Sequence, residues 1–312
     1  MEILSELTNG VCGKIAYTSS SPFEIHHILC KLESVDTHPV FGNLTLPEKG
    51  EGPFPCVVAC HGSRGWVKHQ HEHIENWLKA GIAVFRIHSF ESRDVVSVGE
   101  DQMSVTYAMM LCDSFEALKL LNTHPKIDSK KIAIAGWSLG GAVALYSAWS
   151  PISEILAPDG ERFSAHLPIY PAAHIRPDVQ RWENVPIKIL HGDIDDYTPI
   201  NLVHGLIDYT KEYADMEVIV YENSHHSFDS MEPITWSPNA IKLDSRTVQI
   251  DIDGNMWGEI EKGKKIPLNE PVERKLAFQY AMNIGAHFGG NKITRSRVME
   301  DSKNILIELF NI

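Results

Sequence analysis

The chain has 312 residues, 43% of them hydrophobic, so it can bury the core of a large domain and is not composed like a disordered segment. Its 41 acidic and 28 basic residues give a formal net charge of -13, which argues against binding to a nucleic-acid backbone. No stretch has the roughly 18 consecutive apolar residues of a membrane span, and MEILSELTNG lacks the pattern of a signal peptide. We therefore expect one cytoplasmic domain over residues 1–312, with no membrane partner. The sequence does not predict an oligomeric state.

The predicted elements follow a simple order along the chain. Two short strands, in HHILCKLE (26–33) and FGNLTLP (41–47), are expected to form an antiparallel N-terminal edge. Beyond residue 55, continuous apolar runs alternate with helical stretches, which predicts a mostly parallel central sheet with helices on both faces. The expected strands are 56–60, 82–87, the run before residue 138, 166–170, 187–191 and 217–221, and the expected helices are 71–79, 103–122, 202–213, 274–284 and 300–310. Chemistry in such sheets lies at the carboxyl ends of the strands.

Residues 231–272 interrupt this alternation. The stretch TVQIDIDGNMWGEIE (247–261) alternates around Asp253, Gly254 and Asn255, which predicts a β-hairpin with a tight turn. Asp251 and Asp253 also suggest calcium, but the ligand spacing of an EF-hand is absent, so a turn is preferred. We interpret residues 231–272 as an insertion, or lid, that could cover a site.

The most informative motif is KIAIAGWSLGG, in which Ser138 stands between glycines where a strand turns into a helix. Gly136 and Gly140 would relieve crowding around a strained residue, and the hydroxyl would be exposed at a sharp corner. The backbone N–H of Leu139 would lie at a helix N-terminus, where a developing negative charge is stabilised. The alternative is a tight turn whose serine only caps the helix.

A nucleophilic serine needs a histidine base and an acid to orient it. Strand 187–191 continues into HGDIDDYTP, which contains Asp193, Asp195 and Asp196, and strand 217–221 continues into ENSHHSF, which contains His225 and His226. Serine, acid and histidine thus follow one another in the chain order of α/β-hydrolases. Spacing alone does not choose among the three aspartates or between the two histidines.

A second oxyanion donor is expected in ACHGSRGW, after strand 56–60. Its glycines would let the backbone approach a bound carbonyl group, so the N–H of Ser63, or of Arg64, could join that of Leu139. A flexible loop is the alternative. In the following HQHEH, His69, His71 and His73 could hold a metal if they lay on an extended segment, but on a helix they would point in different directions.

Together these motifs resemble the dienelactone hydrolase family of α/β-hydrolases, from about residue 40 to 228. The resemblance rests on PFPCVVACHGSRG, CDSFEALKLLNTHPKIDSKKIAIAGWSLGG, HGDIDDYTP and YENSHHSF. It implies the α/β-hydrolase fold, Asp195 as the acid, four residues before Pro199, and His226 as the base, two residues before Phe228. In HSFESRDV it places His88 where an aspartate is common and makes Arg93 either a site residue or an ion-pair partner.

The namesake enzymes of that family use cysteine as the nucleophile, and this chain has Ser138. The sequence therefore predicts a serine hydrolase of small carboxylic esters or lactones that requires no cofactor and no metal. Arg64, Arg93 and Trp137 are possible substrate-binding residues. The rival hypotheses are a peptidase or amidase resembling prolyl oligopeptidase and a non-catalytic binding protein on the same fold.

Overall fold

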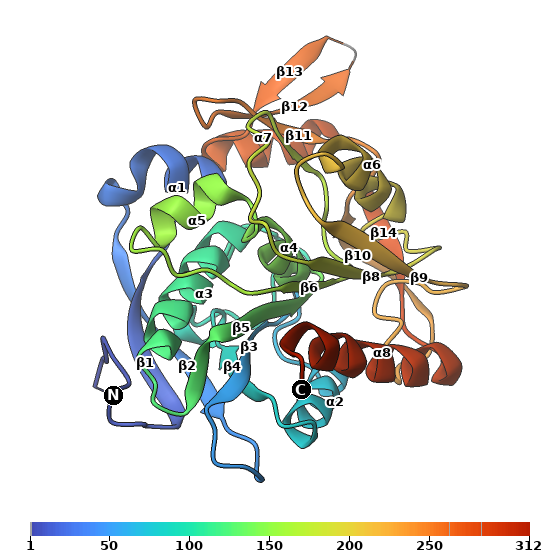
Figure 1. The fold of residues 1–312 in the computed structure, drawn as a ribbon. Helices are drawn as coiled ribbons and strands as arrows, with labels where there is room; N and C mark the ends of the chain where they lie inside the picture. The colour runs from blue at the N-terminus through green and yellow to red at the C-terminus, as the bar shows by residue number, and fades with distance from the viewer. Residues whose placement is uncertain (1, 262, 282) are drawn as a thin grey trace.

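The computed structural model describes residues 2–261, 263–281 and 283–312; residues 1, 262 and 282, one of them within the predicted insertion, lie outside the described residues. An eight-stranded sheet crosses the molecule (Figure 1). In spatial order it comprises β1 (Gly13–Ser20), β2 (Thr37–Thr45), β4 (Ala83–Ile87), β3 (Phe54–Cys60), β5 (Ile127–Trp137), β6 (His166–Ile169), β8 (Ile187–Gly192) and β9 (Met216–Tyr221). Strands β1, β2 and β4 pair antiparallel, and the pairs from β4 to β9 are parallel.

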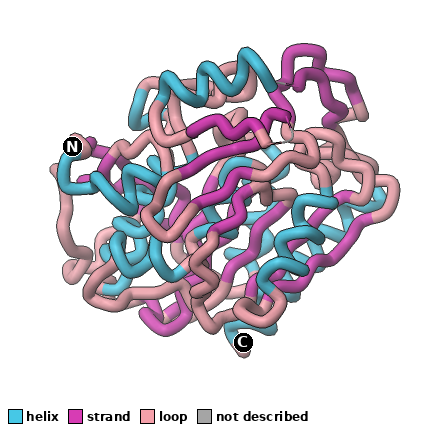
Figure 2. The backbone as a smooth tube through the Cα atoms, turned by 90° about the horizontal axis from the view of Figure 1, so that it is seen from above, coloured by secondary structure: helices cyan, strands magenta, loops and turns pink. Residues whose placement is uncertain are grey.

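Helices cover both faces of this sheet, as predicted. One face carries α1 (Ile25–Lys31), α3 (Tyr107–Asn122), α4 (Leu139–Tyr146), α5 (Ser150–Leu156) and α6 (Ile200–Thr210), and the other carries α2 (Lys68–Lys79) and α8 (Lys292–Phe310). Successive residues of β3 explain why both faces must be covered: Val58 packs into the α3 side and Val57 into the α8 side, and both are fully buried. Figure 2 shows the strands side by side between the helices. Among the described residues, no helix combines the length and apolar character needed to cross a bilayer.

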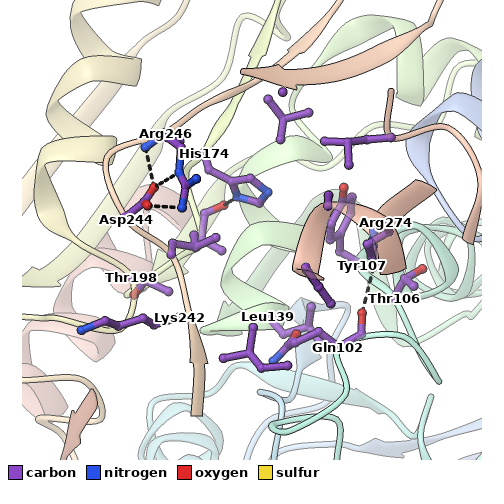
Figure 3. A pocket seen from close by; sticks show the side chains of 18 of the residues that line it. Gln102, Thr106, Tyr107, Leu139, His174, Thr198, Lys242, Asp244, Arg246 and Arg274 are labelled. Atoms are coloured by element: carbon purple, nitrogen blue, oxygen red, sulfur yellow. Dashed lines mark hydrogen bonds and ion pairs between the residues drawn. The ribbon is translucent and has the colours of Figure 1, made fainter. Parts of the chain in front are cut away.

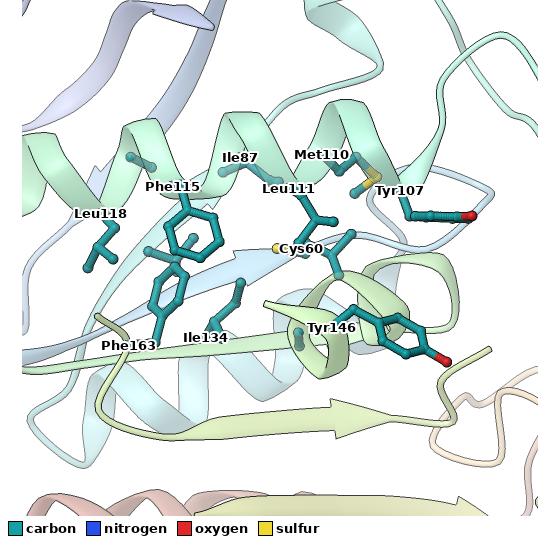
Figure 4. Close-up of a cluster of buried hydrophobic side chains, with 14 of the residues drawn as sticks. Cys60, Ile87, Tyr107, Met110, Leu111, Phe115, Leu118, Ile134, Tyr146 and Phe163 are labelled. Atoms are coloured by element: carbon teal, nitrogen blue, oxygen red, sulfur yellow. The ribbon is translucent and has the colours of Figure 1, made fainter. Parts of the chain in front are cut away.

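The larger core lies between α3 and the sheet (Figure 4). Phe115 of α3 meets Phe163 with ring centroids 5.3 Å apart, and Leu111 and Leu118 are fully buried beside them. Burying one such side chain contributes about 1.5–3 kcal/mol to folding. This packing holds β3 and β5 together, and the ends of these two strands carry part of the site described below.

The N-terminal edge is antiparallel, but one of its strands was predicted in the wrong segment. Residues 26–33 are not a strand; they form most of α1 and the start of a 3-10 turn, Leu32–Ser34, and the edge strand is β1. The apolar residues Ile25, Ile28, Leu29 and Leu32 recur at helical spacing, with Ile25 and Ile28 buried. The segment FGNLTLP begins within β2, as expected.

Between β9 and α8 the chain forms an added segment, residues 231–290. It contains β10 (Thr235–Lys242), β11 (Val248–Ile250), β12 (Met256–Glu261), β13 (Lys264–Pro267), α7 (Pro271–Ala281) and β14 (Asn283–Phe288). Strands β11 and β12 form the predicted hairpin, and the carboxylate of Asp251 accepts hydrogen bonds from the amides of Asp253 and Asn255 in its turn.

The added segment runs further along the chain than the predicted insertion. Strand β14, which the sequence did not predict, pairs antiparallel with β10, so the segment continues past residue 272. Strand β11 pairs parallel with β7 (Ile175–Pro177), which connects the added segment to the rest of the fold. The amide of Gly289 donates to the carbonyl of His226, so the end of β14 lies against the loop after β9.

Candidate active site

The turn between β5 and α4 holds Ser138 in a strained conformation, with φ 55° and ψ -109°. Such a conformation costs a non-glycine residue on the order of 1–3 kcal/mol and is typical of functional sites. Neighbouring glycines make the turn possible: a Cβ on Gly136 would lie 2.1 Å from the carbonyl oxygen of Gly140, and one on Gly140 would lie 2.2 Å from that of Cys60. The predicted strand–serine–helix corner is therefore present, at the N-terminus of α4.

Three side chains from three loops meet at this corner. The Ser138 hydroxyl lies 2.9 Å from Nε2 of His226, and Nδ1 of His226 lies 2.7 Å from Oδ2 of Asp195. All three residues are buried. In this arrangement Nδ1–H donates to the carboxylate and Nε2 accepts from the hydroxyl, which is the tautomer that a general base needs.

The acid of this constellation is held by its own loop. The amides of Tyr197 and Thr198 both donate to Oδ1 of Asp195 at 2.9 Å, and the Thr198 hydroxyl donates to Oδ2 at 3.0 Å. Burial opposes ionisation of Asp195, but His226 and these hydrogen bonds outweigh it and lower the pKa of the carboxyl group. Thr198 stands in the motif DDYTP, but its residue type and spacing alone did not indicate this contact with the acid.

The competing residues of both motifs have other partners. Asp193 accepts a hydrogen bond from the amide of Ser224 at 3.1 Å, and Asp196 pairs with Nδ1 of His287 at 2.8 Å. The ring of His225 faces His287 of β14, with centroids 4.9 Å apart, and not Ser138. Of the aspartates and histidines that the sequence left open, Asp195 and His226 are the pair that meets Ser138.

Aromatic rings surround the imidazole of His226. Tyr170, Tyr197 and Phe288 lie with ring centroids 4.6, 4.7 and 5.4 Å from it, each close to edge-on. The Tyr197 hydroxyl accepts a hydrogen bond from Gln102. These rings come from three distant segments, so no local pattern marked them, and together they fix the plane of the base.

The loop after β3 lies directly against the serine. A Cβ on Gly62 would be 3.6 Å from Cβ of Ser138, and the carbonyl of Ser63 is held by the amide of Val98 at 2.8 Å. Within the described residues, the amides of Ser63 and Leu139 donate no hydrogen bond. Two free donors thus flank the nucleophile, from a strand-end loop and from the first residue of α4.

The sequence matches the model of the dienelactone hydrolase family over residues 42–248. The chain belongs to this family. Membership confirms the family that the motifs predicted, and the sheet and helices described above confirm the predicted fold class.

Three known proteins illustrate what the chain is similar to in sequence and in fold. Esterase FrsA from Serratia proteamaculans (strain 568) is 29% identical over 132 residues, which are 41% of this chain and 29% of that relative, so less than a third of the relative is matched. A thermophilic esterase from the Planctomycetes species Thermogutta terrifontis, with butyrate bound, has a TM-score of 0.50 at 16% identity, over 64% of this chain and 84% of that one. Est1E from Butyrivibrio proteoclasticus has a TM-score of 0.45 at 15% identity, over 61% and 86%.

The other predicted site residues of this dienelactone hydrolase family member lie in different surroundings. Arg64 is exposed and pairs with Glu232 of the added segment at 3.0 Å. The side chain of Arg93 is 8% exposed and forms an ion pair with Asp113 at 2.8 Å, which is the ion-pair role predicted as one of its two alternatives. Trp137 lines a cavity beside Ser138, with its ring fully buried.

The histidines of HQHEH lie on α2 and point in different directions. His69 and His73 approach opposite oxygens of the buried Asp229, at 3.6 and 3.2 Å, whereas Nδ1 of His71 contacts Arg86 at 3.2 Å. Burial opposes the charge on Asp229, but His69, His73 and other hydrogen-bond donors outweigh it and lower its pKa to about 2. The three histidines therefore do not converge on one point, and two of them belong to a buried polar network.

Two cavities of the family member meet at Ser138. The first, of about 230 Å³, lies under the added segment and is lined by Ser138, Leu139, Leu268 and Ala277, among others (Figure 3). The second, of about 520 Å³, is lined by Ser138, Gly62, His226, Trp137 and Ser237, among others. Ser63 and Tyr197 line both cavities. A substrate can therefore extend from Ser138 in two directions.

Charged groups mark the walls of the first cavity. Arg274 of α7 pairs with Glu24, which also accepts a hydrogen bond from the Tyr107 hydroxyl at 2.8 Å. Arg246 pairs with Asp244 (Figure 3). Burial raises the pKa of Glu24, although Arg274 and Tyr107 act against it. Because residues 24, 107 and 274 are far apart in the sequence, no motif could have indicated this group.

Proposed function

We propose that this protein is a serine hydrolase of small carboxylic esters or lactones, working through an acyl-enzyme on Ser138. The observation that carries the proposal is the continuous contact from Ser138 through His226 to Asp195, at 2.9 and 2.7 Å. Family membership supports ester hydrolysis, and serine replaces the cysteine expected from the namesake enzymes.

In the first half of the reaction, Nε2 of His226 removes the proton from the Ser138 hydroxyl while its oxygen forms a bond to the carbonyl carbon. Asp195 stabilises the imidazolium that results and keeps its orientation. The carbonyl oxygen becomes an oxyanion beside the amides of Leu139 and Ser63. Each donor of this kind is worth about 10²–10³-fold in rate.

Collapse of the tetrahedral intermediate breaks the ester C–O bond, and His226 returns its proton to the leaving alkoxide oxygen. The acyl group stays on Ser138. Water then attacks the acyl carbon, with His226 again taking a proton, and the second collapse releases the carboxylic acid and regenerates the serine. These steps use the residues of the chain and water alone.

The two cavities suggest how the substrate lies. The leaving oxygen must come within hydrogen-bond reach of Nε2 of His226. His226 lines the second cavity and not the first, whereas Leu139 lines the first. We therefore assign the alcohol part to the second cavity and the acyl part to the first, whose apolar wall includes Leu268 and Ala277.

The proposal is tested by intact mass after treatment with a fluorophosphonate. We expect one adduct on the wild type, none on Ser138→Ala, much slower labelling of His226→Ala, and normal labelling of the control Ser296→Ala, an exposed serine on α8 outside both cavities. Matched ester and amide substrates then separate an esterase from a peptidase or amidase. Absence of an adduct on folded wild-type protein would reject the nucleophile and favour a binding protein.

A further inference from the structure

A cluster of metal-ligating side chains lies beside the catalytic residues but is not part of them. Asp196 follows the catalytic acid, His225 precedes the catalytic base, and His287 comes from β14 of the added segment. One ligand atom from each lies within 4.8 Å of the other two, and all three residues are partly exposed. The cluster therefore lies close to the surface and outside the hydrophobic core.

The backbone holds these three segments together. His226 and Phe288 form an isolated parallel bridge, and the amide of Gly289 donates to the carbonyl of His226 at 2.9 Å. The amide of His287 donates to Oδ1 of Asp196 at 2.9 Å. Main-chain contacts thus fix His225 and His287 relative to each other, and the carboxylate of Asp196 is joined to the backbone of β14.

The donor set suits a particular class of ion. Nδ1 of His287 shares a hydrogen bond with Oδ2 of Asp196 at 2.8 Å, and Nδ1 of His225 is buried without a hydrogen-bond partner among the described residues. Two imidazoles and one carboxylate are typical ligands of Zn²⁺ and similar divalent transition metals, with remaining positions taken by water. A cation at this position would replace the proton that His287 and Asp196 share. It would also be coordinated by the imidazole of His225, whose Nδ1 has no hydrogen-bond partner among the described residues.

We propose that Asp196, His225 and His287 form a binding site for one divalent transition-metal ion, with Zn²⁺ as the reference ion. The sequence did not predict this metal site. The three ligands are separated by 29 and 62 positions in the chain, and only the fold brings them together. The ion would join the loops after β8 and β9 to β14. It takes no part in the reaction, since Asp195 and His226 remain bound to each other.

The test uses the full chain without a histidine tag, washed with a chelator and then titrated with Zn²⁺ by calorimetry. We expect one ion per chain, and binding weaker by more than about tenfold in His287→Ala and in His225→Ala. The matched control is His204→Ala, an exposed histidine on α6 that should leave binding unchanged. Zn²⁺ should also raise the melting temperature of the wild type, and Co²⁺ should give a visible absorption spectrum.

Asp196→Asn keeps the size of the side chain and removes its charge, and it replaces either alanine variant whose circular dichroism shows misfolding. His226→Ala should retain the ion, which separates this site from adventitious binding at the catalytic histidine. The proposal is overturned if wild-type protein binds no stoichiometric Zn²⁺. It is also overturned if binding survives in folded His287→Ala and is lost in His226→Ala or His71→Ala.

Discussion

The proposed catalytic residues lie at the ends of parallel strands, whereas much of the first cavity is built by the added segment. Ser138, Asp195 and His226 lie one, three and five residues beyond the ends of β5, β8 and β9, and their side chains meet at 2.9 and 2.7 Å. Leu268, Ala277 and Arg274 reach the cavity from an excursion of about sixty residues. Changes in the first region should therefore alter the reaction itself, and changes in the second should alter which substrates react.

The largest effect is expected from Ser138→Ala. The variant should lose on the order of 10⁶-fold in kcat for an ester, because no other group can form the acyl-enzyme. The measurement is the steady-state rate with a chromogenic ester, with thermal unfolding as the control for folding. A variant that keeps a tenth of the wild-type rate would place the chemistry elsewhere.

The next effect separates the three aspartates. Asp195→Asn should lower kcat about 10⁴-fold, because the wrong imidazole tautomer is then favoured. Asp193→Asn and Asp196→Asn are matched controls, since both side chains bond elsewhere, and we expect changes of less than about tenfold for them. Equal losses in all three variants would contradict the assignment of the acid.

Acid should weaken the sheet region through buried histidines. Burial lowers the pKa of His61 and His166 from 6.5 to about 4. The unfolded chain then binds more protons between those values, so stability is full above about pH 6.5 and falls as the pH decreases to about 4, by on the order of 3 kcal/mol for each histidine. Urea unfolding against pH measures this. In His166→Asn the free energy of unfolding should depend less steeply on pH than in the wild type. The same dependence in both proteins would show that His166 does not contribute to the acid sensitivity.

Substrate selection should respond to single side chains in the two cavities. Ala277→Phe narrows the first cavity and should lower kcat/KM for long acyl chains by about 10–100-fold, while short acyl chains react normally. Ser237→Phe in the second cavity should instead disfavour large alcohol groups. The measurement is kcat/KM for a panel of esters in which either the acyl part or the alcohol part is varied. If the two variants have the opposite effects, the acyl part lies in the second cavity and the alcohol part in the first.

The smallest effect on stability is expected from the exposed ion pair between Arg64, in the loop after β3, and Glu232 of the added segment. Arg64→Gln removes the exposed pair with Glu232 and should change stability by less than about 1 kcal/mol. Because Arg64 lines the second cavity, a substrate role would appear as a raised KM with kcat unchanged. If the KM is unaltered for every ester in the panel, Arg64 does not bind substrate and acts only as the ion-pair partner of Glu232.

Much of the fold and part of the site could be predicted because the signals are local. The apolar runs of the parallel strands, the glycines around Ser138 and the motifs after β8 and β9 each lie within a few neighbouring residues. The helix at Ile25–Lys31 also had a local signal, the spacing of its isoleucines and leucines, but it was interpreted as a strand.

The sequence by itself determined the strand-turn-helix position of Ser138 and the chain order of the proposed serine, acid and histidine, because the strand-end loops of a parallel sheet meet at one edge. Only the tertiary structure decided between Asp195 and its neighbours, since that choice depends on distant groups such as the amide of Ser224 and the imidazole of His287. The same holds for β14 and the walls of the first cavity. Such contacts join residues that are far apart in the chain, so short-range sequence patterns cannot predict them.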